Sequence, residues 1–358
     1  MFAVRAPWLV ALVLALGLGA ACKAPAAEAP RAAAPAQPSG SAAAVPPASA
    51  PAEPVSLQRI DVCIPGLSQS FAGVGIAQQA GYFAEVGLDV NIQPIQGVVC
   101  TQALSSSTVQ FSGSPSTLDA IIQGLPYRIV YVSQGRLGHQ MAVAAHVSSW
   151  ADLKGGKIAV SALGSPLSEG LARDILRDEG VNPDDVSFVA LGMPANRLGG
   201  VMSGSVDAAL LSSQEVPMAH NQGLKTLPYK PRVSLGAPMT ATLDLVQSNP
   251  DLVQRFVKGT LMGHLLYLQR KDEALPLVVQ WTDAPDAAYE EQVYDNIHAT
   301  STPDGTLGDE QMRAVIASAK QSVQTSQDFT PDQVFDFRFA RQALQDLQAA
   351  NWHGLWSN

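Results

Sequence analysis

Apolar and polar residues alternate along the chain in short blocks that end in glycine, proline or serine. RIDVCIPG, residues 59–66, alternates with period two and ends in Pro-Gly, which predicts a strand followed by a turn. A helical run is expected over residues 73–80, and the next strand over residues 88–95. Gly81 lies between them and is expected to end the helix in a left-handed conformation. Tyr82 and Phe83 should then pack beneath the sheet.

The alternation of helix and strand continues to residue 135. It predicts a helix over 97–107, a short strand over 109–113, a helix over 114–124 and a strand over 127–135. A β-α-β-α-β order is typical of a parallel sheet with crossover helices. The first part of the folded region is therefore expected to be a doubly wound α/β lobe.

A second lobe with the same pattern is expected from about residue 150 to residue 235. Its strands are predicted at 157–161, 187–192 and 206–212, and its helices at 167–179, 196–204 and 213–223. Residues 109–124 and 206–223 share the order short strand, hydroxyl-rich turn, helix and Gln-Gly ending. Two similar lobes in one chain predict a ligand cleft between them. Helical patterns over 249–270, 309–323 and 338–351 are expected to pack back on the lobes, and in the first of them Leu252, Phe256, Leu261, Leu265 and Leu268 share one face.

Composition and charge exclude several classes of protein. The 358 residues are 47% hydrophobic and carry a net charge of −9, which argues against a disordered acidic chain and against a nucleic-acid-binding surface. Three cysteines are too few for a paired zinc motif, and no two of the six histidines have metal-ligand spacing on a predicted helix. His139 stands apart because it follows a strand near the crossing between lobes. We expect no metal site.

Catalytic and cofactor motifs are also missing. The chain has no HExxH, GxSxG or phosphate-binding Walker motif. Residues 73–75, GVG, follow a strand and open a helix, but the third glycine of a dinucleotide fingerprint would fall at Gln78. We therefore expect neither a bound cofactor nor an enzyme.

The N-terminus resembles an export signal. Arg5 precedes the apolar run of residues 7–19, which is short for a permanent transmembrane helix and suits a signal peptide. LGAAC, ending at Cys22, is similar to a bacterial lipobox, so residues 1–22 are expected to be a signal peptide and Cys22 to carry a lipid; ordinary cleavage at an Ala-x-Ala site is the alternative. Residues 23–56 are rich in alanine and proline and are expected to form a disordered tether. Residues 57–358 then form the soluble binding domain, outside the cytoplasm and anchored to a bacterial membrane.

Five turns at predicted strand ends carry hydroxyl groups and open helices. The free N–H groups and partial positive charge of a helix N-terminus can hold carboxylate, sulfonate or phosphate groups. Ligands of open α/β sheets bind beyond the carboxyl ends of the strands. The set therefore favours a cleft for a small anion, whereas any one turn alone would be an ordinary helix cap. The turns are residues 66–70, 97–102, 112–117, 164–168 and 212–215.

Cys63 and Cys100 leave two alternatives open. In an exported chain they could pair as a disulfide, since Cys63 is on the first predicted strand and Cys100 follows the second. They could equally be two buried free thiols.

Three spaced motifs resemble the substrate-binding proteins of nitrate-, sulfonate- and thiamine-precursor-type ABC importers. They are IAQQAGYFAEVGLDVNI (76–92), DLKGGKIAV (152–160) and VMSGSVDAALLS (201–212). The chain departs from the pattern at Ser107 and Gln110, where glycine and aspartate are common, which indicates an altered local turn. The resemblance implies a two-lobed periplasmic-binding-protein fold, whose first lobe spans about residues 57–140 plus the C-terminal helices.

The resemblance also implies a role and a set of ligand contacts. Such a protein binds a small molecule in the cleft and presents it to the permease and ATPase subunits of an importer, and we expect it to act as a monomer. Arg136 is a candidate partner for an anion. The positions that match family ligand contacts are Ser68, Gln69, Ser70, Cys100, Thr101, Ser114, Ser116, Thr117, Gly164, Ser165, Asn196, Ser213 and Glu215.

Other functions of the same fold remain open from the sequence. A small organic anion such as a sulfonate is favoured as the ligand, because aromatic residues that could stack on a pyrimidine or flavin precursor are sparse. A ligand-sensing lipoprotein would have the same sequence features. An enzyme similar to pyrimidine synthases is disfavoured because the chain lacks their cysteine-rich motif.

Overall fold

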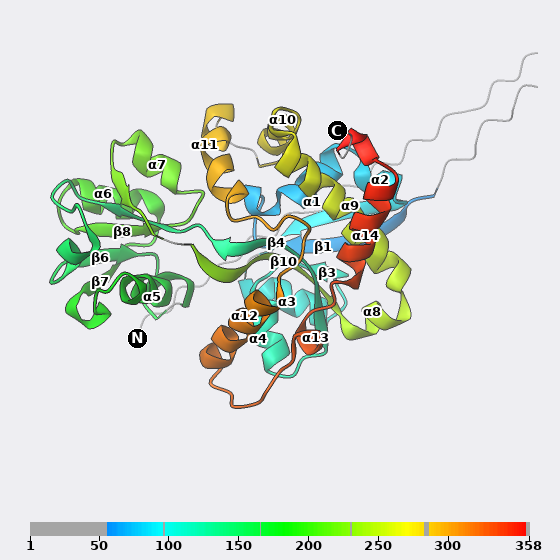
Figure 1. The fold of residues 1–358 in the computed structure, drawn as a ribbon, viewed down its shortest axis with the longest axis horizontal. Coiled ribbons are helices and arrows are strands. Elements are labelled where there is room, and N and C mark those ends of the chain that lie inside the picture. The colour runs from blue at the N-terminus through cyan, green and yellow to red at the C-terminus, as the bar shows by residue number, and fades with distance from the viewer. Residues whose placement is uncertain (1–55, 96, 165, 230, 283–285, 356–358) are drawn as a thin grey trace, which may run out of the picture. The chain divides into compact units, whose positions relative to one another are not determined.

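We describe the protein from a computed structural model, which covers residues 56–95, 97–164, 166–229, 231–282 and 286–355 (Figure 1). The chain divides into a unit of residues 1–53 and a unit of residues 54–358. The first unit lies outside the described residues. The predicted signal peptide, Cys22 and nearly all of the tether therefore stay sequence-based expectations, and the elements described below all belong to the second unit.

The first sheet has the strand order β2-β1-β3-β10-β4. Its strands are β1 (Gln58–Ile64), β2 (Leu88–Pro94), β3 (Phe111–Ser112), β4 (Tyr127–Leu137) and β10 (Arg232–Thr242). β1 runs parallel to β2 and β3, as expected. β10, which the sequence patterns did not predict, lies antiparallel between β3 and β4. The sheet is mixed rather than wholly parallel, because the chain returns from the second lobe along β10.

The second sheet has the order β7-β6-β8-β5-β9. β6 (Lys157–Val160) runs parallel to β7 (Ser187–Ala190) and β8 (Ala208–Leu211), as expected. β5 (Gln140–Val143) pairs antiparallel with β8 and with β9 (Lys225–Leu227). The chain thus enters this sheet between β4 and β5 and leaves it between β9 and β10. We call these two connections the crossing segments.

Helices cover both faces of each sheet (Figure 1). One face of the first sheet packs against α1 (Ala72–Gln79), α2 (Tyr82–Glu85), α8 (Leu243–Ser248), α9 (Pro250–Gln269), α10 (Lys271–Thr282), α11 (Ala287–His298) and α14 (Arg338–Ala349). The other face packs against α3 (Gly97–Ser105), α4 (Ser116–Ile122), α12 (Asp309–Ser322) and α13 (Pro331–Val334). In the second lobe α5 (Leu171–Asp178) covers one face, and α6 (Pro194–Met202) and α7 (Val216–Asn221) cover the other. Short 3₁₀ or π turns occur at Gln69–Phe71, Trp150–Leu153, Pro166–Gly170, Pro183–Asp185 and Trp352–Gly354.

The glycines of the GVG sequence are packing residues. A Cβ at Gly73 would lie 3.0 Å from the Thr260 carbonyl oxygen on α9, and one at Gly75 would overlap the Trp281 indole. α1 can approach α9 at Gly73 and α10 at Gly75 closely because these positions lack a side chain. The motif therefore serves helix packing, which accounts for its departure from a dinucleotide fingerprint.

Of two backbone turns in the first lobe, the one at Gly81 follows the sequence-based expectation, and the one at Ser107 does not show the altered turn that was expected. Gly81 has a φ of 81°, and Tyr82 and Phe83 after it are buried, as predicted. Ser107 has a φ of 56°, the left-handed region that glycine adopts at no steric cost. The serine therefore keeps the turn that a glycine would make, at a cost of about 1 kcal/mol. Gln110 accepts a hydrogen bond from the Asp61 N–H at 2.7 Å, which ties this turn to β1.

Cys63 at the end of β1 and Cys100 on α3 form a disulfide in the structure. Their Cα atoms are 5.7 Å apart, and both residues are fully buried. The bond therefore fastens α3 to the strand whose carboxyl end leads into the loop of Ser68 and Ser70.

Candidate cleft between the lobes

A cavity of about 400 Å³ lies where the strand ends of both sheets meet. Its lining comes from the loops after β1, β3 and β8 and from the facing parts of β4 and β10 with the first crossing segment. We call this cavity the cleft. Its lining residues are Pro65, Ser68, Ser70, Phe71, Pro115, Gln134, Arg136, Leu137, Gly138, His139, Ser212, Ser213, Gln214, Ser234, Leu235, Gly236 and Ala237. Binding beyond the carboxyl ends of strands is the expected place in this kind of sheet.

A smaller cavity of about 140 Å³ adjoins the cleft and extends it into the second lobe. The two cavities share His139 and Ser212. Ser161 and Ser168, from the turn after β6, line it together with Arg197, Leu210 and Glu215. Four of the five hydroxyl-rich turns therefore reach the combined site. The turn of residues 97–102 does not line either cavity.

Arg197 and Glu215 form an ion pair in this smaller cavity. Their Nη2 and Oε1 atoms are 2.7 Å apart, and Arg197 is buried with 4% of its surface exposed. The guanidinium also donates to the backbone carbonyls of Gly192 and Leu210. Glu215 accepts a further hydrogen bond from the Ser212 N–H at 2.8 Å. The pair is electrically neutral, so this part of the site offers directed hydrogen bonds rather than net positive charge.

His139 lies at the junction of these cavities. Its Nδ1 atom is covered and has no hydrogen-bond partner among the described residues. Burial of the ring lowers the pKa of His139 to about 4. The imidazole is therefore neutral at physiological pH, and a ligand could satisfy its free nitrogen. The sequence indicated only that His139 follows a strand near the crossing; Arg197 carried no sequence signal at all.

The structure brings five of the predicted ligand residues to the site. Ser68, Ser70, Arg136 and Ser213 line the cleft, and Glu215 lines the smaller cavity. Arg136 lies on β4 and is exposed, and it makes no ion pair with any described residue. It is therefore available to an anionic ligand group.

Gln69 is placed away from the cleft, in the interior of the first lobe. Its Nε2 donates to the Glu290 backbone carbonyl at 2.6 Å, and its Oε1 accepts from the Tyr267 hydroxyl at 2.6 Å. Both amide atoms are used by α9 and α11, so Gln69 holds the loop of Ser68 and Ser70 in position rather than facing a ligand.

Four other predicted residues also serve the packing of the first lobe. Cys100 is in the disulfide, and Thr101 beside it is buried. The Ser114 hydroxyl donates to the Gly97 carbonyl at 3.1 Å, and the Thr117 hydroxyl is 2.8 Å from that of Thr240 on β10. These bonds fix α3 and α4 against the sheet and leave Pro115, between Ser114 and Thr117, to form the cleft wall.

The remaining predicted residues lie outside the cleft lining. Ser116 lines a neighbouring cavity of about 300 Å³ between α4, β10 and α12, which shares Pro115, Ser234 and Leu235 with the cleft. Gly164 is exposed and donates its N–H to Glu169, and Asn196 is exposed on α6. Ser165 lies outside the described residues.

Gly138 occupies a narrow place between the lobes. A Cβ there would overlap the Ser213 hydroxyl of the second lobe and lie 3.2 Å from the Thr300 methyl group of the first. Gly138→Ala is therefore expected to push the lobes apart and to weaken ligand binding about tenfold, since overpacking costs about 1–3 kcal/mol. Calorimetric titration of a cleft ligand measures the change.

The control for this prediction is Gly199→Ala on α6, where an added Cβ meets no atom within 4 Å. In the double variant Gly138→Ala with Ser213→Gly, the alanine should have a smaller effect than it has alone. Equal effects of the alanine with and without Ser213 would contradict the steric explanation.

Among the described residues, no group of three or more histidine, cysteine, aspartate or glutamate side chains could hold a metal ion. None of the described helices is long and apolar enough to cross a membrane.

Comparison with solved structures defines the class of fold. The putative sulfonate ABC transporter protein SsuA, a periplasmic sulfonate-binding protein from Methylobacillus flagellatus, superposes with a TM-score of 0.64 at 19% identity, over 82% of this chain and 96% of that one. The desulfurization enzyme DszB superposes with a TM-score of 0.59 at 16% identity, over 80% and 99%. The chain has the fold of the periplasmic binding proteins.

Sequence comparison gives the family. Residues 68–274, more than half of the chain, match the model of the NMT1/THI5 like family, and the chain belongs to it. A formylaminopyrimidine-binding protein of Halalkalibacterium halodurans is 26% identical over 241 residues, which cover 63% of this chain and 71% of that protein. The resemblance found from the three sequence motifs is confirmed.

Proposed function

We propose that this protein is the extracytoplasmic solute-binding component of an ABC importer. The observation that carries the proposal is the cleft, because its walls come from strand ends of both lobes and movement of one lobe would open or close it around a small molecule. Relatives that are named as binding proteins for formylaminopyrimidine and for sulfonates support it. The bound solute would be delivered to a permease driven by an ATPase.

Attachment to a membrane is part of the same proposal. The lipobox-like sequence ending at Cys22 would supply a lipid anchor, and residues 23–56 would hold the binding domain away from the membrane surface. One protein molecule would present one solute to the permease.

The favoured solute is a small organic anion such as a sulfonate. Arg136 supports this choice, since it is the charged side chain of the cleft lining that has no partner among the described residues. A carboxylate or sulfonate could approach its guanidinium while the Ser68, Ser70 and Ser213 hydroxyls donate hydrogen bonds.

An uncharged heteroaromatic solute is the second candidate, and the smaller cavity favours it. The neutral Arg197–Glu215 pair and the neutral His139 ring offer donors and acceptors without net charge. Phe71 in the cleft wall could pack against a ring. The formylaminopyrimidine-binding relative agrees with this candidate.

A thermal-shift screen of residues 57–358 with sulfonates, nitrate, pyrimidines and flavins, followed by calorimetry, tests both candidates. If the solute is an anion, Arg136→Gln is expected to weaken binding about tenfold, because it removes the charge that faces the solute. Arg59→Gln, which changes an exposed arginine on β1, is the matched control. Unchanged binding of an anion by Arg136→Gln would contradict the role of Arg136.

We further propose that the protein binds its solute without converting it. The fold alone does not distinguish a binding protein from an enzyme, because the enzyme DszB has a similar fold. Mass spectrometry of the solute after prolonged incubation with the protein should recover it unchanged. Conversion of every stabilising compound would refute the binding-protein function.

A further inference from the structure

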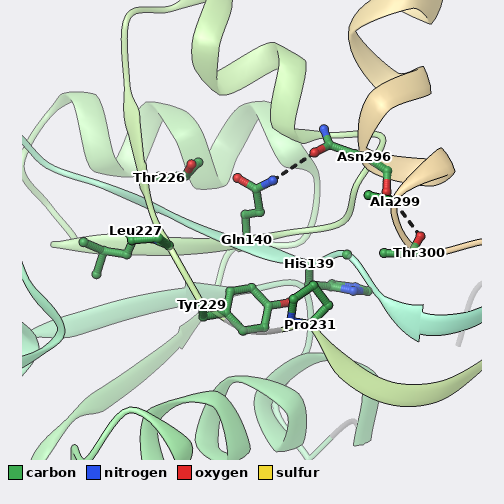
Figure 2. Close-up of a pocket in the computed structure, with 11 residues that line it drawn as sticks. His139, Gln140, Thr226, Leu227, Tyr229, Pro231, Asn296, Ala299 and Thr300 are labelled. Atoms are coloured by element: carbon green, nitrogen blue, oxygen red, sulfur yellow. Dashed lines mark hydrogen bonds between the residues drawn. The ribbon is translucent and has the colours of Figure 1, made fainter.

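A further cavity, of about 280 Å³, lies beside the crossing segments (Figure 2). It shares Gly138 and His139 with the cleft, so the first crossing segment forms a wall between the two cavities. Gln140, Thr226 and Leu227 belong to strands of the second lobe. Asn296 and Thr300 come from α11 and its C-terminal end in the first lobe. The cavity is therefore lined by residues of both lobes and of both of their connections.

One wall of this cavity is flat, apolar and held in place. Tyr229 and Pro231 both line it (Figure 2). The Trp150 ring meets the Tyr229 ring edge-on, with centroids 6.3 Å apart. Trp150 is itself fixed because its Nε1 donates to the Pro228 carbonyl at 3.0 Å. Tyr229 therefore presents a face on which a planar molecule can stack.

The opposite wall carries uncharged amide groups. Gln140 Nε2 donates to Asn296 Oδ1 at 3.1 Å, the contact drawn in Figure 2. Within the described residues, Gln140 Oε1 and Asn296 Nδ2 have no hydrogen-bond partner. The pair therefore leaves one acceptor and one donor, which match the N–H and C=O of another amide.

Among the described residues, the lining contains no lysine, arginine, aspartate or glutamate. A charged molecule would lose its hydration here without gaining a partner of opposite charge among the described residues, which is costly. An uncharged molecule with polar edges and an apolar face would meet no such penalty.

We propose that this cavity is a second binding site, for a small, planar, uncharged molecule that carries a carboxamide or lactam group. The molecule stacks on Tyr229 and pairs its amide with Gln140 and Asn296. Because these residues belong to different lobes, the occupant bridges the lobes and couples to the opening of the cleft. The site is separate from the solute cleft and does not depend on the identity of the solute.

Nicotinamide is a suitable probe, and nicotinate, its charged analogue, is the matched control compound. Saturation-transfer NMR and titration of residues 57–358 should show nicotinamide binding with a Kd of about 1 mM, as expected for so small a molecule. Nicotinate should bind at least tenfold more weakly. Equal binding of the two compounds would overturn the proposal.

Substitutions in the lining test whether nicotinamide binds in this cavity. Ala299→Trp, at an exposed lining position, fills the cavity, and Asn296→Leu removes the amide; each should weaken nicotinamide binding at least tenfold. Ser318→Trp, at an exposed position in the cavity between α4 and α12, should leave binding unchanged. Melting temperatures show whether each variant is folded.

Two further results would overturn the second site while leaving the solute cleft intact. One is the absence of nicotinamide binding at about 10 mM. The other is binding that Ser213→Trp in the cleft abolishes and Ala299→Trp does not change. Failure of the solute-binding function, in contrast, would appear as a lack of any ligand whose binding depends on cleft residues.

Discussion

Replacement of Glu215 by alanine is expected to lower the free energy of unfolding by about 3 kcal/mol. The change leaves the Arg197 guanidinium, whose side chain is 5% exposed, without its carboxylate partner. Breaking a buried ion pair from one side costs about 3–5 kcal/mol because the remaining charge stays buried. The lower end applies here because 22% of the Glu215 side chain is exposed and water can reach the gap. Urea unfolding measures the change.

Two variants control this prediction. Glu85→Ala removes an exposed carboxylate of α2 that forms no ion pair among the described residues, and it should cost less than about 0.5 kcal/mol. The double variant Arg197→Met with Glu215→Leu removes both charges and should recover most of the lost stability. If Glu215→Ala is no more destabilising than Glu85→Ala, the ion pair contributes nothing to the fold.

The double variant Arg197→Met with Glu215→Leu also separates the effect of the ion pair on stability from its effect on solute binding. The double variant should fold, yet it lacks the hydrogen-bonding groups of the smaller cavity. If an uncharged solute forms hydrogen bonds with Arg197 and Glu215, the double variant should lose affinity for that solute while remaining stable. If the solute interacts only with Arg136, its affinity should stay within about threefold of the original.

Loss of the disulfide is expected to cost about 4 kcal/mol. Cys63 and Cys100 are 37 residues apart, and a cross-link that closes a loop of this size restricts the unfolded chain by about that amount. The double variant Cys63→Ala with Cys100→Ala should therefore unfold at a lower urea concentration than the original protein. The solute site should also be affected, because α3 would lose its bond to the strand that leads to Ser68.

Reductant provides the matched control for the disulfide. It should destabilise the original protein under conditions that reduce the buried bond, and it should leave the double alanine variant unchanged. Detection of two free thiols by mass spectrometry of the unreduced, exported protein would show that the bond does not form there.

Helix α9 illustrates a part of the fold that could be predicted from the sequence. The spacing of its apolar residues predicted one buried face: Leu252, Phe256, Leu261 and Leu265 are buried and Leu268 is partly buried, although residues 259–267 are buried on every side of the helix. The prediction succeeded because the period of 3.6 residues is a local property of the helix. Strand β10 could not be found in this way: its residues pair antiparallel with β4, about 100 positions earlier, and no local period encodes that pairing.

The same distinction between local and long-range information applies to the candidate site. Serine-rich turns at strand ends predicted a site at this edge of each sheet, because ligands of such sheets bind at the carboxyl ends of strands, and the cleft lies there. The turns alone could not show which side chains face the cavity. Ser68 lines the cleft and Gln69 beside it points into the lobe, since Tyr267 and Glu290 lie about 200 residues away in the chain and bind its amide.

By itself, the sequence determined the order of most elements, the two-lobed fold, the family and the edge at which the cleft lies, because periodicity, glycine turns and motif order are properties of neighbouring residues. Only the tertiary structure decided that Arg197 is neutralised by Glu215, that Gly138 lies in close contact with both lobes, and that a further cavity lies beside the crossing segments. These features depend on side chains brought together from distant segments. The orientations of these side chains are fixed by packing in the complete fold.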